Sequence, residues 1–589
     1  MIDRRRPLFE PELLVRTALV WVAVCALMLV ASFGSISAGR FPDPDDVMRL
    51  MQVRDLLAGQ SWFDVHQYRV DAVSGGVPMH WSRLVDVPLA ALIWLFSLFM
   101  AQGAAEIAAA IMVPLLTFGI ALLLASRIAW RLIGAEAAGM TCLVMAVSVP
   151  VIIQMGPLRI DHHGWQIVLA LLALNGMMAR DPRLGGALTG FALALWISIS
   201  VEGLPLALAI CGVAALRWLG DRRASCRMAS IMGSLAVVSA LIFAGTRGFS
   251  DLAQYCDAVS PVHLAVFGWG GVSIFVLAHC EPIPRGALLS GFAVIAAGAA
   301  GIVYFAAPQC AGGGFEALDP LVTKYWYRNV SEGMPMWQQS PALAMQMLIP
   351  PALGLLAAVK LAGRSSDWLR QWWYDYAMLL GAALLIALFV ARAGAVAGAI
   401  ASIPLGWQIA VWIRAARNMR SRGRRIATLA GTALALMPAL PLGLLTALIP
   451  TEVRAKDNGA QTADCPISDA LPTLRKLPEG EIIAPIDMGP ELLNSTAHSV
   501  IATGHHRGSP GMAAMIRIFI GSAAEAEAAL LARGTRYVAV CPGLVEARNY
   551  ARTMPDGFMA DLLGGDEPSW LEPVAVPGGG AVRIWRIKR

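Results

Sequence analysis

The chain has little charge. Of its 589 residues only 15% are charged and 57% are hydrophobic, whereas soluble domains carry about 25% charged and roughly 45–50% apolar residues. This composition excludes an ordinary soluble enzyme, and it also excludes a disordered chain, a collagen and a coiled coil. A repeat of the solenoid or propeller kind is absent as well. The formal net charge of +6 is assigned to loops on the cytoplasmic side of a membrane rather than to a nucleic-acid surface, so no nucleic-acid partner is expected.

The nine cysteines include no Cys-x-x-Cys pair, which argues against a structural zinc knuckle. Three of them lie in apolar runs and are expected to pack there: Cys25, Cys142 and Cys211. Cys465 and Cys541 both fall in the C-terminal segment, where a disulfide is expected if the compartment is oxidising. Cys256 and Cys310 form a second candidate pair, for which two free thiols are an equal alternative.

The hydrophobic excess predicts a polytopic α-helical membrane protein, since each span needs about 20 mostly apolar residues. The first apolar run, Leu13–Ser32, follows three arginines and is predicted to be a retained helix rather than a cleaved signal peptide. Arginines recur at every second loop, most densely over residues 414–425, and these loops are placed in the cytoplasm. The alternation predicts about thirteen spans, with the N-terminus inside and the C-terminus outside. Residues 86–102 are counted as a half-span or a helix along the surface.

The composition changes after Pro450, where spaced charges and a tail rich in proline and glycine begin. Two runs in this segment, residues 481–484 and 536–540, are strand-like. Between them Ala523–Arg533 is helix-like, and Gly534 is a natural stop for it. The sequence therefore predicts a membrane domain over residues 1–450 and a small α/β domain over residues 451–589, outside the cytoplasmic membrane.

Four clusters of charged residues lie at the predicted outer ends of spans. Burying ionisable groups in a membrane costs free energy, so such residues are first interpreted as functional. The clusters contain, in chain order, Asp43, Asp45, Asp46 and Arg49; Asp161, His162 and His163; Glu332; and Arg392. Carboxylates and an imidazole brought together at helix ends suit a divalent cation: the oxygen ligands favour magnesium or manganese, and the imidazole shifts the preference towards manganese or zinc. A fixed arginine fork beside them would hold a phosphate. The combination indicates activation of a phosphate-linked leaving group.

These clusters resemble the motifs of the oligosaccharyltransferase catalytic subunits, in the same order along the chain. Asp43-Pro44 with Arg49 resembles the Asp-Pro-x-x-x-x-Arg pattern of their first outer loop, and Asp161-x-His163 resembles their second acidic motif. The stretch 329–332, Asn-Val-Ser-Glu, is similar to their SVSE motif. Arg392 is placed like the family arginine that binds the lipid-linked phosphate.

The resemblance implies a GT-C fold and an inverting glycosyl transfer from a polyprenyl-(pyro)phosphate sugar at the outer face of the membrane. Asp43, Asp161, His163 and Glu332 are then expected to hold the cation within about 10 Å of one another, and Asp43 and Glu332 also to polarise the acceptor. Further candidates are His162 as a second imidazole, and Asp45 or Asp46 in place of Asp43. Glu202 is a candidate contact of the donor sugar.

One motif departs from the family, whose members read an Asn-x-Ser/Thr sequon with WWDYG. Here the equivalent stretch, residues 485–489, is Pro-Ile-Asp-Met-Gly, which keeps Asp487 and loses all three aromatic residues. A glycosyltransferase with another acceptor (a lipid, a glycan or another protein site) is therefore preferred. The alternatives are a protein N-oligosaccharyltransferase with a divergent acceptor pocket, and a transporter or flippase of lipid-linked sugars. A transporter would place ionisable groups near the middle of its spans. The stretch His505-His506-Arg507 is expected to be a solvated basic turn, or else to face the sugar-phosphate site.

Overall fold

The computed structural model describes residues 9–249, 251–310, 312–315, 318–447, 465, 467–577 and 581–588. The chain divides into two compact units. The first unit comprises Met1–Arg40, Trp81–Gly314 and Ser331–Leu445. The second comprises Phe41–His80, Phe315–Val330 and Thr446–Arg589.

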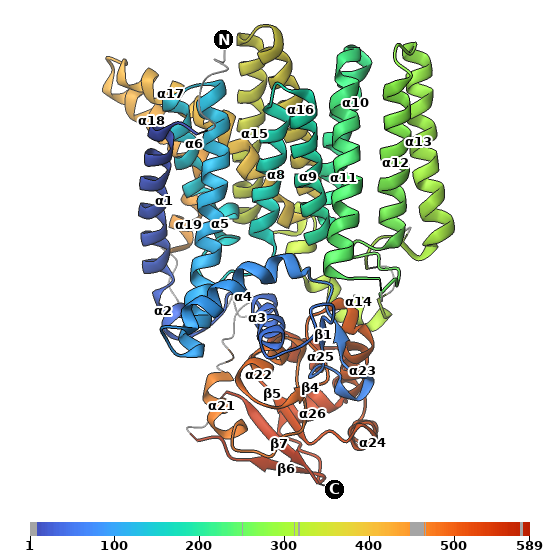
Figure 1. Cartoon of the computed structure of the whole chain (residues 1–589). Helices are drawn as coiled ribbons and strands as arrows, with labels where there is room; N and C mark the ends of the chain where they lie inside the picture. The colour runs from blue at the N-terminus through green and yellow to red at the C-terminus, as the bar shows by residue number, and fades with distance from the viewer. Residues whose placement is uncertain are drawn as a thin grey trace. The chain divides into compact units, whose positions relative to one another are not determined.

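The first unit is a bundle of helices (Figure 1). Among the described residues, ten helices are long and apolar enough to cross a membrane. They are α1 (Pro11–Ala31), α5 (Gln102–Leu132), α9 (Pro182–Ile199), α10 (Leu204–Gly220), α11 (Ser225–Thr246), α12 (Pro261–His279), α13 (Arg285–Ala306), α15 (Pro341–Arg364), α16 (Asp367–Phe389) and α17 (Gly394–Arg417). The predicted class, a multi-pass α-helical membrane protein, is confirmed.

Among the described residues, seven shorter α-helices lie wholly or mostly in this unit. They are α2 (Phe33–Ser37), α4 (Arg83–Ser97), α6 (Ala135–Val147), α7 (Val149–Ile153), α8 (His163–Met178), α18 (Arg422–Leu436) and α19 (Leu440–Ala447). Of these, α6 and α8 are apolar and too short for the count of ten, so the total of about thirteen spans stays a prediction. The predicted half-span or surface helix corresponds to α4, which runs crosswise to the long helices (Figure 1).

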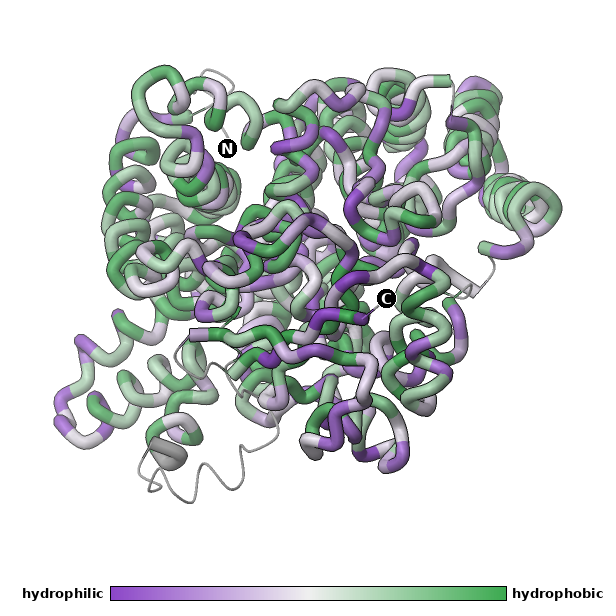
Figure 2. Tube along the Cα trace, turned by 90° about the horizontal axis from the view of Figure 1, so that it is seen from below, coloured by the Kyte–Doolittle hydropathy of each residue, from purple (hydrophilic) through white to green (hydrophobic). Residues whose placement is uncertain are grey.

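Much of the bundle surface is apolar. In Figure 2 green, the colour of hydrophobic residues, predominates along the helices of this unit. Helix α13 shows the extreme case: it buries only Leu288 and exposes Leu289, Val294, Tyr304 and Phe305. Apolar patches of this extent are rare on soluble monomers and match a lipid environment.

Helices α9 and α11 approach each other closely because glycines line their contact. A Cβ atom on Gly186 would lie 2.5 Å from the carbonyl oxygen of Arg227, and one on Gly190 would lie 2.2 Å from that of Ile231. Small residues are the usual means of close helix packing in membranes, where hydrophobic burial gives no net drive. Because α9 also packs on α8, this contact fixes the helix that begins at His163.

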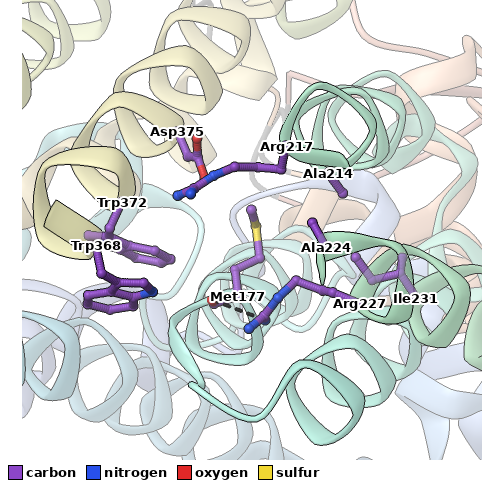
Figure 3. A pocket seen from close by; sticks show the side chains of 9 residues that line it. All are labelled: Met177, Ala214, Arg217, Ala224, Arg227, Ile231, Trp368, Trp372 and Asp375. Atoms are coloured by element: carbon purple, nitrogen blue, oxygen red, sulfur yellow. Dashed lines mark hydrogen bonds and ion pairs between the residues drawn. The ribbon is translucent and has the colours of Figure 1, made fainter. Parts of the chain in front are cut away.

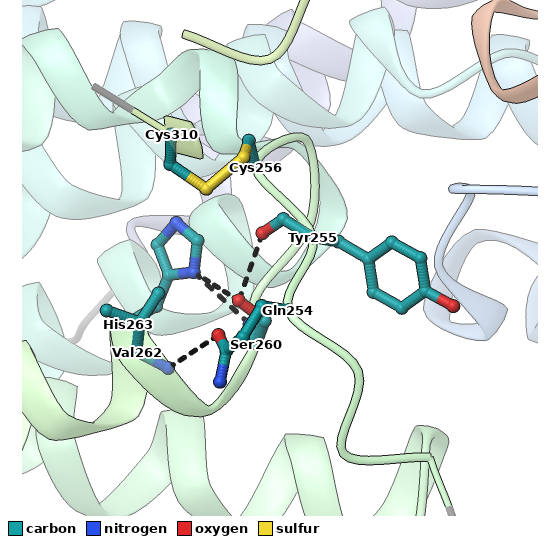
Figure 4. Close-up of a disulfide and its surroundings, with 7 residues drawn as sticks. All are labelled: Gln254, Tyr255, Cys256, Ser260, Val262, His263 and Cys310. Atoms are coloured by element: carbon teal, nitrogen blue, oxygen red, sulfur yellow. Dashed lines mark hydrogen bonds between the residues drawn. A yellow bond between two sulfur atoms is a disulfide. The ribbon is translucent and has the colours of Figure 1, made fainter. Parts of the chain in front are cut away.

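Both candidate disulfides are present, Cys465–Cys541 in the second unit and Cys256–Cys310 in the first, where two free thiols were an equal alternative. The Cys256–Cys310 disulfide joins the segment after α11 to the turn after α13 (Figure 4). Beside it, Ser260 and His263 form a capping box at the start of α12. The covalent link and the cap together hold the ends of three long helices.

The second unit contains a five-stranded sheet in the order β4-β3-β5-β7-β6. Its strands are β3 (Glu481–Ile483), β4 (Ser499–Val500), β5 (Tyr537–Val540), β6 (Leu571–Val574) and β7 (Arg583–Ile587). Strand β3 is parallel to β4 and β5, and β7 is antiparallel to β5 and β6. The predicted strand-like runs correspond to β3 and β5. The small C-terminal α/β domain of the sequence prediction is therefore present.

Helices of the C-terminal segment accompany this sheet. They are α21 (Ile467–Leu474), α22 (Gly489–Ser495), α23 (Ser509–Ile520), α24 (Ala523–Arg533), α25 (Val545–Thr553) and α26 (Phe558–Gly564). Helix α24 has the predicted bounds, because Ser522 and Glu525 form a capping box at its start. Gly534 ends it with φ = 77°, a left-handed conformation that favours glycine.

The same unit also contains the loop over residues 41–80 and part of the long loop before α15, both predicted to face outward. The first supplies α3 (Pro44–Leu57), which packs on α22, and a hairpin of β1 (His66–Gln67) and β2 (Val77–Pro78). Val70 pairs with Val500 next to the sheet, and Asp71 accepts a hydrogen bond from Arg533 at 2.7 Å. The long loop supplies α14 (Pro320–Tyr325), which packs on α23.

Candidate active site

A buried acidic and imidazole cluster lies at the start of α8 in the first unit. Asp161 Oδ1 accepts a hydrogen bond from the His162 backbone N–H at 2.6 Å and lies 2.6 Å from His162 Nδ1. Its other oxygen, Oδ2, lies 3.3 Å from His163 Nε2. All three side chains are buried, with 5–6% exposure. The tight turn fits here because Gly164 lies close to the Gln154 carbonyl oxygen, 3.1 Å from where a Cβ would be.

Three further charged residues meet this cluster from one-turn 3-10 helices. Glu332 lies in the turn Ser331–Gly333, Arg392 in Ala391–Ala393 before α17, and Glu202 in Val201–Gly203 before α10. The first two turns are joined by a hydrogen bond from the Ala391 N–H to the Met334 carbonyl, 3.1 Å. The turns of Glu202 and Arg392 therefore present a charged side chain at a helix start, and that of Glu332 does so from the loop before α15, rather than in the middle of a span.

The side chains form one continuous network. His163 Nε2 lies 3.9 Å from Glu332 Oε1, and Arg392 Nη1 lies 3.5 Å from the same oxygen. The Arg392 Nη1 atom also lies 3.0 Å from Glu202 Oε1. Of the residues predicted from the sequence, the structure thus brings together Asp161, His162, His163, Glu332, Arg392 and Glu202. Glu202 pairs with Arg392, and its contact with the donor sugar stays a prediction.

Two residues of this network were not predicted. Gln166 Nε2 donates to Glu202 Oε2 at 3.2 Å and lies 3.2 Å from His163 Nδ1. Trp196 Nε1 donates to Gln166 Oε1 at 3.1 Å. Gln166 follows His163 by three residues, on the same face of an otherwise apolar helix. A polar residue in that position of an apolar helix could have identified Gln166 as a candidate site residue from the sequence.

The cluster has the chemistry of a metal site. One ligand atom from each of Asp161, His162 and His163 can be chosen so that all lie within 4.8 Å of one another. The Glu332 carboxylate adds a further oxygen 3.9 Å from His163 Nε2. A buried carboxylate and imidazole with a second carboxylate at the edge suit manganese or zinc, and magnesium less well because of the imidazole.

The remaining predicted residues lie in the second unit. Asp43 caps α3, where its Oδ1 accepts a hydrogen bond from the Asp45 N–H at 3.0 Å. Asp46 and Arg49 are one turn apart on the same helix and are 0% and 1% exposed. Asp43 also lies near Asp487, and desolvation by the surrounding groups together with the Asp43 carboxylate raises the pKa of Asp487, although this side chain is exposed.

A third carboxylate, Glu546, accompanies this pair and was missed from the sequence. Its oxygens accept hydrogen bonds from the N–H groups of Ile486 and Asp487, at 2.9 and 3.2 Å, and from the Tyr550 hydroxyl at 2.7 Å. Burial and the neighbouring Asp487 raise the pKa of Glu546 to about 8. The local sequence at 541–550 contains no pattern that predicts the contact of Glu546 with Ile486 and Asp487. These residues are 60 and 59 positions away in the sequence, and the fold of the sheet brings them together.

The turn at residues 505–507 is not solvated as predicted. His505 is 3% exposed, and its Nε2 lies 2.7 Å from His80 Nδ1. The His506 ring centroid lies 4.7 Å from that of His80. The hairpin of the first outer loop covers the turn, since Arg507 Nη1 donates to the Met79 carbonyl at 3.2 Å.

Comparison with solved structures identifies the fold. The chain is similar to the archaeal oligosaccharyltransferase AglB of Archaeoglobus fulgidus in complex with an inhibitory peptide and a dolichol-phosphate, with a TM-score of 0.61, 15% identity, and coverage of 95% of this chain and 72% of the other. A second structure of the A. fulgidus enzyme, tethered to an acceptor peptide containing the NVT sequon, gives a TM-score of 0.63, 14% identity and coverage of 97% and 74%. A third, a complex with Zn and sulfate, gives 0.54, 14% identity and coverage of 89% and 68%. No protein-family model and no curated protein sequence matches the chain. The fold is thus that of the GT-C membrane glycosyltransferases, as the motifs predicted.

Proposed function

We propose that the chain is a membrane glycosyltransferase that transfers a sugar or glycan from a polyprenyl-(pyro)phosphate donor to an acceptor. The observation that carries the proposal is the network of Asp161, His163, Glu332 and Arg392, placed at helix ends in a fold similar to that of AglB. The A. fulgidus enzyme is known in complexes with dolichol-phosphate and with Zn and sulfate. A cation site beside an arginine fork suits the same chemical groups here.

In the proposed reaction the bond between the sugar C1 and the phosphate oxygen breaks, and C1 bonds to the acceptor from the opposite face. The phosphate leaves with the bonding electrons, and the acceptor loses a proton. Arg392 would bind the phosphate, and Asp161, His163 and Glu332, with Asp43, would hold the divalent cation. When bound, the cation neutralises charge that builds on the departing oxygens. Asp43 and Glu332 would also polarise the acceptor.

The proposal extends to location and organisation. The network would face outward from the cytoplasmic membrane, opposite the arginine-rich loops. Residues 1–450 would carry the membrane domain and 451–589 the outer domain. The charged residues of the network lie at the starts of helices or, for Glu332, in the loop before α15, which favours an enzyme over a transporter with ionisable groups at the membrane centre.

Donor discharge tests the proposal without knowledge of the acceptor. The full chain is reconstituted in vesicles with polyprenyl-phosphate and polyprenyl-pyrophosphate sugars, with cell membranes as a source of acceptors. Release of the free polyprenyl phosphate or pyrophosphate is then measured with manganese, magnesium, zinc or a chelator. We expect release that needs a divalent cation. Movement of intact donor across the vesicle, with no bond broken, would establish the transporter alternative instead.

A further inference from the structure

A cavity of about 90 Å³ lies in the first unit among the ends of α8, α10, α11 and α16 (Figure 3). Its polar lining consists of Arg217, Arg227 and Asp375, and its apolar walls include Met177, Trp368 and Trp372. The volume accommodates several water-sized groups. None of these residues belongs to the candidate active site.

The cavity lies at the end of the bundle opposite that site. Helix α10 starts next to Glu202 and reaches Arg217 fifteen residues later, a rise of about 22 Å at 1.5 Å per residue. Helix α8 likewise starts at His163 and reaches Met177 at the cavity. The arginine-rich loops at 180–183, 217–227 and 364–370 lie at this same end, so it corresponds to the cytoplasmic surface of the membrane.

The charges of the cavity sum to a positive value. Arg217 Nε donates to Asp375 Oδ2 at 2.5 Å, which pairs one guanidinium with one carboxylate. Arg227 instead donates to the carbonyl oxygens of Gly176, Met177 and Ala179 at the end of α8. Two guanidinium groups therefore face a single carboxylate, and an anionic group would balance the difference.

Two buried polar atoms at the cavity have no hydrogen-bond partner among the described residues. One is the donor Trp372 Nε1, on a residue 3% exposed, and the other is the acceptor Asp375 Oδ1, on a residue 4% exposed. The Gln371 side chain also hydrogen-bonds to this carboxylate, and Oδ1 is the oxygen of Asp375 for which no partner lies within hydrogen-bond distance among the described residues. Buried polar groups normally have partners, because leaving one unpaired costs free energy. A ligand that accepts a hydrogen bond from Trp372 Nε1 and donates one to Asp375 Oδ1 would satisfy both atoms.

We propose that this cavity binds the headgroup of an anionic glycerophospholipid. Its phosphodiester accepts hydrogen bonds from Trp372 Nε1 and Arg217, and a headgroup hydroxyl, such as those of a glycerol, donates to Asp375 Oδ1. Met177 and Trp368, at the ends of α8 and α16, add apolar walls beside these polar groups. Basic pockets between membrane helices at the cytoplasmic side are known sites for anionic lipid headgroups. Inorganic phosphate shares the anion but has no use for the apolar walls.

Lipid exchange on the reconstituted full chain tests the proposal. The protein is placed in phosphatidylcholine nanodiscs, and bound phosphatidylglycerol is measured as its fraction is raised, with and without inorganic phosphate. We expect saturable binding that Trp372→Phe weakens about tenfold, because phenylalanine keeps the ring and loses the N–H. The double variant Arg217→Gln, Asp375→Asn removes both members of the ion pair together, while Arg227 keeps its carbonyl acceptors at the end of α8. We expect this variant to bind phosphatidylglycerol more weakly than the unmodified chain does.

Two matched variants control for the change of residue type and charge. Trp94→Phe makes the same change on α4, at a residue that is 62% exposed and does not line the cavity. Arg223→Gln removes one charge from the same basic loop at an exposed position. Both should bind phosphatidylglycerol as the unmodified chain does. Equal binding by all variants, or competition by inorganic phosphate at concentrations comparable to the lipid, would overturn the lipid assignment.

Discussion

His163 makes the central contacts of the candidate site, since its Nε2 lies between carboxylate oxygens of Asp161 and Glu332. These residues were identifiable from the sequence because ionisable groups next to membrane spans cost free energy and therefore indicate a function. Their mutual contacts were not, because Asp161 and Glu332 are separated by more than 150 residues. Glu202 illustrates the difference: its position made it a candidate, but the 3.0 Å ion pair with Arg392 was not predictable from the sequence.

Asp161→Asn should abolish most cation-dependent donor discharge while the protein stays folded. The amide still accepts the His162 N–H, but a neutral oxygen is a poor ligand for a divalent cation. A cation contributes several kcal/mol to charge stabilisation, so the rate should fall by at least about 100-fold. Discharge is measured at saturating manganese, together with the melting temperature. Glu136→Gln, on the exposed surface of α6, is the control. A large loss of folded protein in Asp161→Asn alone would indicate a structural role.

Arg392→Lys should raise the KM for the polyprenyl donor about tenfold with a smaller effect on kcat. Arg392 Nη1 already lies between Glu202 and Glu332, and a planar guanidinium can contact these carboxylates and a phosphate at once, whereas a single ammonium cannot. The matched control is Arg222→Lys, at an exposed loop position. An unchanged KM would remove Arg392 from the donor site.

Short 3-10 turns are the elements that build the site. Helices were predictable from apolar runs, and α24 even to its last residue, because its caps are local signals. The turns that carry Glu202, Glu332 and Arg392 each span three residues, too few for a periodic pattern. The same limit applies in the second unit, where Glu546 of α25 reaches the N–H groups of Ile486 and Asp487 only through the sheet.

The pKa of Glu546, raised to about 8 by burial and by Asp487, predicts a pH dependence of stability. An unfolded glutamate titrates near 4.3, so between about pH 4.3 and 8 the folded state binds more protons than the unfolded state. Stability then falls as the pH rises through this window. Glu546→Gln removes the titration, and its melting temperature should decline less between pH 5.5 and 8.

The measurement follows thermal unfolding of the full chain in detergent at several pH values. Glu567→Gln, an exposed change of the same type, should retain the pH dependence of the unmodified chain. Parallel curves for the unmodified chain and Glu546→Gln would contradict the raised pKa.

For the whole molecule, the order of short motifs predicted a fold that the comparisons with AglB support over 95% of the chain. The bundle was predictable because its composition suits lipid. The composition of the second unit was less predictable. Besides the C-terminal segment it contains residues 41–80 and 315–330, which belong to loops of the membrane domain in the sequence. Their contacts, such as the 2.7 Å hydrogen bond from Arg533 to Asp71, connect residues hundreds of positions apart, and hydropathy carries no information about such pairing.

The acceptor is the property in which the molecule should differ from a sequon-reading oligosaccharyltransferase. At residues 485–489 the side chains of Ile486 and Met488 are 1% and 0% exposed, and Ile486 packs with Ile483 and Ile501 in the core of the second unit. Neither offers an N–H or hydroxyl to a bound Ser/Thr. An unpaired buried hydroxyl costs about 1–3 kcal/mol, enough to remove sequon preference. Given its lipid-linked donor, the protein should glycosylate an Asn-x-Thr peptide no better than the Asn-x-Ala peptide, measured by competition in one reaction. A preference of about tenfold, roughly 1.4 kcal/mol, would restore the N-oligosaccharyltransferase alternative.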